Sequence, residues 1–260
     1  MNDIAGRPAT ISKVAEVTIY FWIMKVLATT LGETAGDFIS MTLGLGYYAG
    51  LGITLAILIV ILAIQIVASS YHPLLFWAAI IATTTAGTEI SDFMDRSLGL
   101  GYGLGSAILI VGLLLALAVW FLRDRNLRVY PIVKRDTEVC FWIAVLLSNS
   151  LGTAFGDFLV DDLGLTFMQG ALVTAGVIGI VAAFHYWSDL SDDLLFWIAF
   201  IFTRPFGATF GDFLTKPLDQ GGLNLPRGYA SLATLALLLA TLYISTHFRT
   251  RRAPDRSASS

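Results

Sequence analysis

The stretch that decides the fold is residues 21–38, which read FWIMKVLATTLGETAGDF. Three later stretches repeat it: residues 76–93 (FWAAIIATTTAGTEISDF), 141–158 (FWIAVLLSNSLGTAFGDF) and 196–213 (FWIAFIFTRPFGATFGDF). In every copy the aspartate follows the tryptophan by 15 residues. A pair of small residues four apart also recurs, at Gly32/Gly36, Gly87/Ser91, Gly152/Gly156 and Gly207/Gly211. A register shared by four copies identifies an internal repeat.

Each repeat reads as two helices joined by a short loop. The predicted pairs are 14–42 with 47–69, 74–97 with 102–122, 138–161 with 167–187, and 194–216 with 229–247. The tryptophans are separated by 55, 65 and 55 residues, and the longer interval contains the charged stretch 123–136, so the chain divides into two halves. We predict a single membrane domain over 1–260, with repeats at 14–69, 74–122, 138–187 and 194–247 and a polar cytoplasmic tail at 248–260.

The composition indicates that lipid surrounds most of these helices. Hydrophobic residues make up 56% of the chain and charged residues 13%, and the mean hydropathy is +0.75. Residues 47–69 and 102–122 contain no charged residue, and each has the length of about 20 residues that crosses a bilayer. The predicted fold class is therefore all-α: a polytopic membrane protein of eight transmembrane helices. Because each repeat has two spans, all four repeats are expected to be parallel.

The basic residues predict how the chain is oriented in the membrane. Eleven lysines and arginines fall in 1–13, 123–135 and 249–256, whereas Arg96, Lys216 and Arg227 fall on the opposite side. Loops rich in lysine and arginine stay in the cytoplasm, so both termini are predicted to be cytoplasmic. Each aspartate then lies about 22 Å beyond its tryptophan along the helix, towards the outer face.

Acidic residues within the predicted spans are the strongest functional signal. A carboxylate in a span is costly and usually faces a protein interior or a water-filled path. We expect four parallel repeats to bring their equivalent acids together, with Glu33 and Glu89 one turn away on the same helix faces. Carboxylate oxygens suit divalent cations such as Mg²⁺, Mn²⁺ or Ca²⁺, or a proton relay. The candidate ion-binding residues are Asp37, Asp92, Asp157, Asp212, Glu33 and Glu89, with the four aspartates as metal ligands.

A structural interpretation of the same acids stays open. Aspartate after glycine is a good helix-capping or turn residue, so Gly-Asp-Phe could simply end each helix. The Phe-Trp pairs are expected to form aromatic belts at the membrane interface, and the small-residue pairs are expected to be helix-packing surfaces. On this interpretation the chain would be a scaffold or a partner subunit that transports nothing.

Further polar residues lie at one depth, seven residues after each tryptophan: Thr29, Thr84, Asn149 and Arg204. Their different chemistry suggests an asymmetric lined cavity. Lys25 and Arg204 are the two cations within spans, and each is expected to neutralise a nearby carboxylate. Arg204 could instead meet an anionic substrate, which keeps an organic or anionic solute as an alternative cargo.

Other function classes find no support in the sequence. No nucleophile elbow, Walker loop, zinc-protease motif or dinucleotide fingerprint is present, so we do not expect an enzyme or a cofactor. Nothing resembles a nucleic-acid-binding segment. Cys140 is the single cysteine, and the three histidines lack zinc-site spacing. Without an ATP motif, transport would be passive or ion-coupled.

The Phe-Trp pairs, the Gly-x-x-x-Gly-Asp-Phe segments and the Leu-Gly-Leu-Gly-Tyr loops resemble a bacterial inner-membrane family of unknown function. That family has four tandem two-span repeats with a characteristic tryptophan, and the resemblance covers about residues 20–245. The second repeat departs by having Ser91 in place of glycine. The resemblance implies a bacterial inner-membrane location and no established activity. More loosely, an acid-Gly-Asp motif in membrane spans is similar to that of some manganese and calcium exporters, so the leading hypothesis is export of a divalent metal cation.

Overall fold

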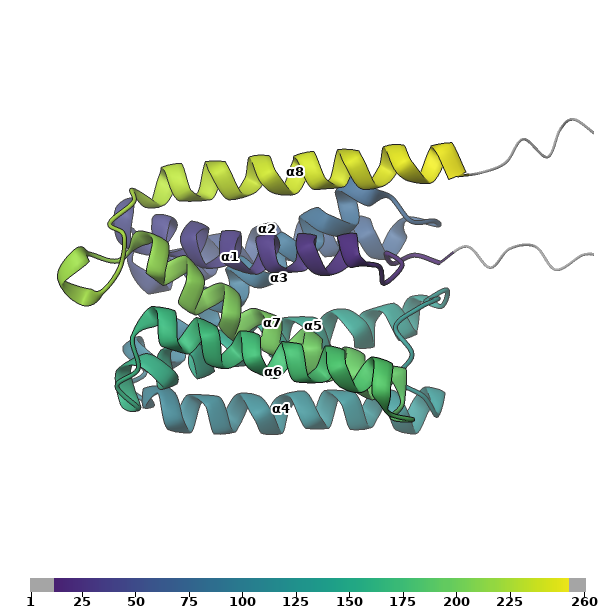
Figure 1. The fold of residues 1–260 in the computed structure, drawn as a ribbon, viewed down its shortest axis with the longest axis horizontal. Helices are drawn as coiled ribbons and strands as arrows, with labels where there is room; N and C mark the ends of the chain where they lie inside the picture. Colours follow the sequence, from purple (N-terminus) through teal and green to yellow (C-terminus); the bar gives the residue numbers. More distant parts are fainter. Residues whose placement is uncertain (1–11, 253–260) are drawn as a thin grey trace, which may run out of the picture.

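A computed structural model describes residues 12–252, with side chains described up to residue 247. Within this part the chain forms eight α-helices (Figure 1). They are α1 (Ile19–Asp37), α2 (Gly46–Val67), α3 (Pro73–Asp92), α4 (Gly101–Asp124), α5 (Arg135–Asp157), α6 (Phe167–Trp187), α7 (Asp192–Thr215) and α8 (Arg227–Arg252). Short π-helical turns extend α1, α3 and α5, at Phe38–Thr42, Phe93–Ser97 and Phe158–Asp162. The predicted helix pairs are present in all four repeats.

Local sequence explains where the helices begin and end. The Thr18 side chain accepts a hydrogen bond from the first turn of α1, and Pro73 occupies the first turn of α3, where its missing N–H costs nothing. The Leu-Gly-Leu-Gly-Tyr loops turn on paired glycines: in the first repeat Gly44 and Gly46 have φ of 67° and 72°, a backbone region that other residues rarely adopt.

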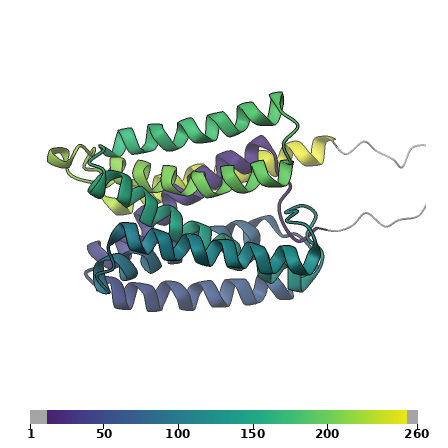
Figure 2. The same ribbon diagram turned by 90° about the horizontal axis from the view of Figure 1, so that it is seen from below.

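The odd-numbered helices form a closed inner ring. Helix α1 packs against α3, α3 against α5, α5 against α7, and α7 back against α1. The even-numbered helices surround this ring, and each packs against the inner helix of the following repeat: α2 on α3, α4 on α5, α6 on α7, and α8 on α1. The repeats therefore interlock, and α8 closes the circle. Figures 1 and 2 show the helices side by side along the long axis, with both ends of the described chain at one end of the bundle.

Seven of the eight helices described in residues 12–252 are long and apolar enough to cross a membrane. Helix α1 is not among them; its 19 residues include Lys25, Glu33 and Asp37. In the most apolar stretches, 67–72% of the residues are buried in α3, α5 and α7, but only 22–28% in the outer helices. The outer helices thus present apolar side chains to their surroundings, and the inner helices present theirs to one another.

The aromatic pairs occupy the end of the ring nearest the chain termini. Ring centroids of Phe21 and Trp77 lie 5.6 Å apart, and the same contact recurs around the ring. The other three contacts are Phe76–Trp142 at 5.6 Å, Phe141–Trp197 at 6.5 Å and Phe196–Trp22 at 5.5 Å. All of these side chains except Trp22 are buried. The expected interfacial belt is therefore wrong, because these aromatic residues form an inward-facing closed layer.

The segment before α1 explains why this helix starts at Ile19 and not at the predicted residue 14. Lys13 forms a buried ion pair with Glu138 at the start of α5, and its ammonium also donates to the carbonyl of Ile66 at 2.8 Å. Gln65 donates to both Glu138 and the Lys13 carbonyl. These contacts hold residues 12–15 against other elements instead of in a helix. At the other end, α8 continues to Arg252, past residue 248, where the tail is predicted to begin; residues 253–260 of that tail lie outside the described residues.

Candidate functional site

A stripe of every fourth residue runs along one face of each inner helix and faces the other three. In α1 the stripe consists of Phe21, Lys25, Thr29, Glu33 and Asp37. Residues four apart lie above one another on a helix, so the stripe forms a column. All of its members are buried, as are the equivalent columns Phe76–Ile80–Thr84–Thr88–Asp92, Phe141–Val145–Asn149–Thr153–Asp157 and Phe196–Phe200–Arg204–Ala208–Asp212. The four columns surround the axis of the ring.

Glycines let the inner helices approach closely at the middle of this axis. A Cβ added to Gly207 would collide with the Thr29 side chain, and the corresponding glycine of each repeat meets the residue seven after tryptophan in the next inner helix. The other three contacts are Gly32 with Thr84, Gly87 with Asn149, and Gly152 with Arg204. The predicted small-residue packing surfaces are present, and they place Thr29, Thr84, Asn149 and Arg204 at one level.

Arg204 extends across the centre of the ring. Its guanidinium lies 2.9 Å from Glu33 Oε2 and donates to the Thr153 hydroxyl at 2.6 Å, to the Thr88 hydroxyl at 2.5 Å and to the Thr29 carbonyl at 3.2 Å. One side chain thereby joins all four inner helices. The expectation that Arg204 neutralises a carboxylate is confirmed, and its positive charge is already compensated by Glu33.

Lys25 occupies the level closer to the aromatic layer. Its ammonium donates to Asn149 Oδ1 at 2.9 Å and lies 4.0 Å from the centroid of the Phe200 ring. Asn149 in turn donates to the Thr83 hydroxyl at 3.2 Å. Among the described residues no carboxylate lies within ion-pair distance of Lys25, so the expected neutralisation is wrong for this residue. An amide and an aromatic face are its partners instead.

The four aspartates meet in one buried layer at the opposite end of the axis. Lys216 lies 3.1 Å from Asp37 Oδ2 and 3.0 Å from Asp212 Oδ1. Arg96 lies 3.4 Å from Asp92 Oδ1 and 3.4 Å from Asp157 Oδ2. A third cation, Arg227 at the start of α8, lies 3.3 Å from Asp37. The aspartates are thus brought together as two cation-bridged pairs, Asp37 with Asp212 and Asp92 with Asp157, and each carboxylate is part of an ion pair.

Sequence reasoning missed the cations of this layer. Arg96 and Lys216 each follow an aspartate by four residues, the spacing at which side chains on one helix meet. The four-residue spacing could have predicted that Arg96 and Lys216 pair with these aspartates, but both residues were considered only in predicting the orientation of the chain in the membrane. Burial lowers the pKa of Lys216, but the charges of Asp212 and Asp37 outweigh it and raise this pKa above its usual value.

Two aspartates of the layer, Asp37 and Asp212, could hold a metal ion together with Glu33, whereas the predicted ligands Asp92 and Asp157 are not part of this group. Glu33, Asp37 and Asp212 each offer an oxygen within 4.8 Å of the others, and all three side chains are buried. Oxygen donors of this kind match the preference of hard divalent cations. Lys216 and Arg204 contact the same carboxylates, so a cation entering here would compete with charges that the chain itself provides.

Glu89 does not join the other candidate ligands. Its carboxylate lies at the interface of α3 with α2 and α1. On the α2 side, a Cβ added to Gly50 would collide with Glu89 Oε2. On the α1 side, a Cβ added to Gly36 would lie 3.6 Å from Glu89 Oε1. Neither oxygen has a hydrogen-bond partner among the described residues, and the nearby Ser40 hydroxyl donates to the Gly36 carbonyl instead. The expected common helix face of Glu89 and Asp92 is therefore wrong.

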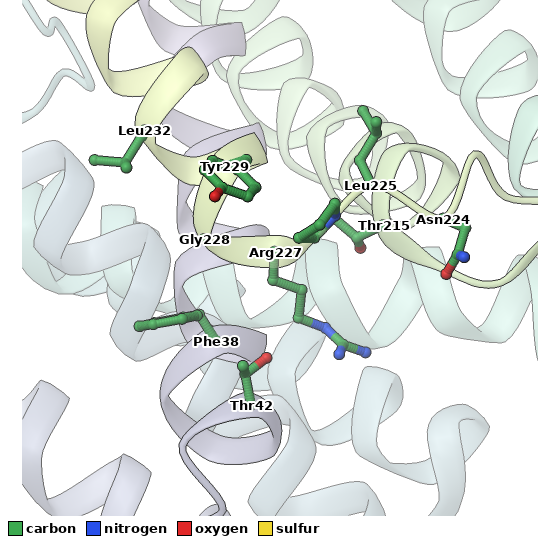
Figure 3. Close-up of a pocket in the computed structure, with 10 residues that line it drawn as sticks. Phe38, Thr42, Thr215, Asn224, Leu225, Arg227, Gly228, Tyr229 and Leu232 are labelled. Carbon is green, nitrogen blue, oxygen red and sulfur yellow. The ribbon is translucent and has the colours of Figure 1, made fainter.

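Two pockets open beside the aspartate layer. The first, of about 350 Å³, is polar and is lined by Arg96, Lys216, Asp157, Asp161, Asp212 and Tyr102, among others. The second, of about 580 Å³, lies between the end of α1 and the start of α8. Figure 3 shows the Arg227 side chain leaving the start of α8 in this second pocket, near Phe38 and Thr42. Both of these pockets lie at the aspartate end of the axis.

Together, fold and site define an all-helical protein of four interlocked two-helix repeats around a charged, buried axis. The chain belongs to the family described as Repeat of Unknown Function (DUF347), whose repeat profile matches residues 20–71, 75–126, 140–191 and 195–252. This confirms the resemblance seen in the repeated motifs. No curated protein and no solved structure matches the chain.

Proposed function

We propose that the protein is an integral membrane transporter of eight spans that moves a divalent metal cation, Mn²⁺-like, along the axis of the inner ring. The observation that carries this proposal is a buried group of three acids beside the aspartate layer: oxygens of Asp37, Asp212 and Glu33, which is one turn from Asp37, lie within 4.8 Å of one another. Buried acids in apolar helices mark ion paths because their burial is otherwise costly.

In this proposal the membrane is the bacterial inner membrane and both termini are cytoplasmic. The aromatic layer then closes the cytoplasmic end of the axis, and the aspartate layer faces the outer side. The polar pocket lined by Arg96 and Lys216 supplies an approach to the aspartates from outside. Apolar outer helices would contact lipid, and their exposed leucines, isoleucines and valines support that placement.

Charge balance supports coupling to an ion or a proton. Five carboxylates of the axis, Glu33 and the four aspartates, face four cations: Arg96, Arg204, Lys216 and Arg227. The formal sum of these ion-paired groups is one negative charge, or zero when Lys25 of the same axis is included, which is too little for a bound divalent cation unless internal ion pairs open. Cation entry would therefore be accompanied by rearrangement of these pairs.

Mn²⁺ flux into liposomes containing the purified protein tests the proposal. Asp37→Asn and Asp212→Asn should each reduce flux by about tenfold or more, because they remove a ligand charge. Asp189→Asn, at an exposed loop position, is the matched control and should leave flux unchanged. Full flux in both axial variants would remove the cation site from this layer.

A non-transporting scaffold is the second candidate, and a specific observation favours it. Each of the four aspartates in the layer is ion-paired, so the layer could serve only to hold the ring together. In that case wild-type protein would show no Mn²⁺ flux above empty liposomes, and the asparagine variants would lose only folding stability.

A further inference from the structure

The ammonium of Lys216 lies where a bound cation would lie. It is 3.1 Å from Asp37 Oδ2 and 3.0 Å from Asp212 Oδ1, and these two carboxylates form the three-acid group with Glu33. The side chain is only 13% exposed. Lysine is a compact point charge on a flexible stem, so its ammonium can substitute for a small cation.

The repeats show that a cation at this position is not a common feature of all four units. The residue 19 after each tryptophan is Met41, Arg96, Asp161 and Lys216 in repeats one to four. A cation is therefore present in alternate repeats, and only in the fourth does it contact two members of the three-acid group. Arg96 serves the opposite pair of aspartates.

We propose that Lys216 is a tethered counterion that occupies the cation site at rest and is displaced by the transported cation. This inference rests on the proposed transport function and specifies its cargo as positively charged. A neutral or anionic cargo would have no reason to compete with an ammonium group for these oxygens.

The surroundings of Lys216 give the displaced side chain a place to go. Lys216 directly follows Thr215, the last residue of α7, and its backbone is already extended, with φ −72° and ψ 155°. It lines the polar pocket of about 350 Å³, and Asp161 and Gln220 line the same pocket. A rotation of the side chain into this pocket would exchange Asp37 and Asp212 for Asp161 and water, which leaves the displaced ammonium near a carboxylate.

Mn²⁺ binding to the protein in lipid nanodiscs tests the competition. Lys216→Met removes the competing charge, so Mn²⁺ should bind about tenfold more tightly or better than to wild type by titration calorimetry. Lys134→Met, at an exposed loop position, is the control and should leave affinity unchanged. Equal or weaker Mn²⁺ binding by the Lys216→Met variant would overturn the inference.

A second measurement uses the wild-type side chain and does not depend on the variant's folding. Mn²⁺ should increase the rate at which an amine-reactive reagent modifies Lys216, as read by peptide mass spectrometry. A modification rate that Mn²⁺ leaves unchanged, in protein that transports Mn²⁺, would overturn the role of Lys216 alone. Absence of Mn²⁺ flux in wild-type protein would overturn the proposed function, and the inference with it.

Discussion

Removing Arg204 should destabilise the protein strongly, and removing Glu33 with it should restore much of the loss. The Arg204 guanidinium is fully buried, 2.9 Å from Glu33 Oε2, and donates to groups on all three other inner helices. Arg204→Met leaves Glu33 as an uncompensated buried charge, which costs about 3–5 kcal/mol of unfolding free energy. Glu33→Met leaves the guanidinium three neutral acceptors, so its cost should lie near the lower end, about 3 kcal/mol.

The double variant carries no uncompensated charge. Thr88 and Thr153 retain other acceptors, the carbonyls of Thr84 at 3.2 Å and Asn149 at 3.4 Å, so their hydroxyls stay satisfied. The two substitutions together should then cost only about 1–2 kcal/mol, so the coupling free energy, which is the sum of the two single costs minus the double cost, should be about 4–7 kcal/mol.

Equilibrium unfolding by dodecyl sulfate in mixed micelles, followed by tryptophan fluorescence, measures these free energies. The exposed Arg123–Asp136 pair provides a control cycle, because solvent screening limits its coupling to about 1 kcal/mol or less. Strictly additive costs for Arg204→Met and Glu33→Met would refute the reasoning, since they would mean that the two charges do not interact.

Two further predictions use the same unfolding assay. Gly207→Val should cost about 1–3 kcal/mol because its side chain would collide with Thr29, whereas Gly176→Val on α6 meets open space and should be nearly neutral; equal effects would contradict the close packing of the ring. Glu89→Met should raise the unfolding free energy by about 1–3 kcal/mol, because it removes a buried carboxylate without hydrogen bonds, and Mn²⁺ flux should persist. Loss of flux in that variant would return Glu89 to the ion path.

The interlocked arrangement of repeats has a consequence for stability. Because each outer helix packs on the inner helix of the next repeat, most of the helix packing runs between repeats and not within them. Repeat proteins usually stack open-ended and need atypical terminal units, but here α8 returns to α1 and closes the circle. The four repeats are therefore expected to unfold together.

Sequence periodicity alone determined the parts of this protein that depend on local geometry. The constant spacing from tryptophan to aspartate predicted four equivalent helix pairs, and the four-residue spacing of Phe21, Lys25, Thr29, Glu33 and Asp37 placed these side chains on one face. Equivalent positions in parallel repeats must lie at one level, so the meeting of the four aspartates was predictable.

Only the tertiary structure decided which neighbouring elements each side chain contacts. Glu89 is one residue past the position equivalent to Glu33, and one residue turns a helix by about 100°, which moves its carboxylate from the axis to the α2 interface. The Phe-Trp pairs could face lipid or the ring with the same sequence, and only the packing of neighbouring helices turned them inward. The pairing of Lys216 with Asp37 joins residues far apart in the chain, and no local pattern specifies such a contact.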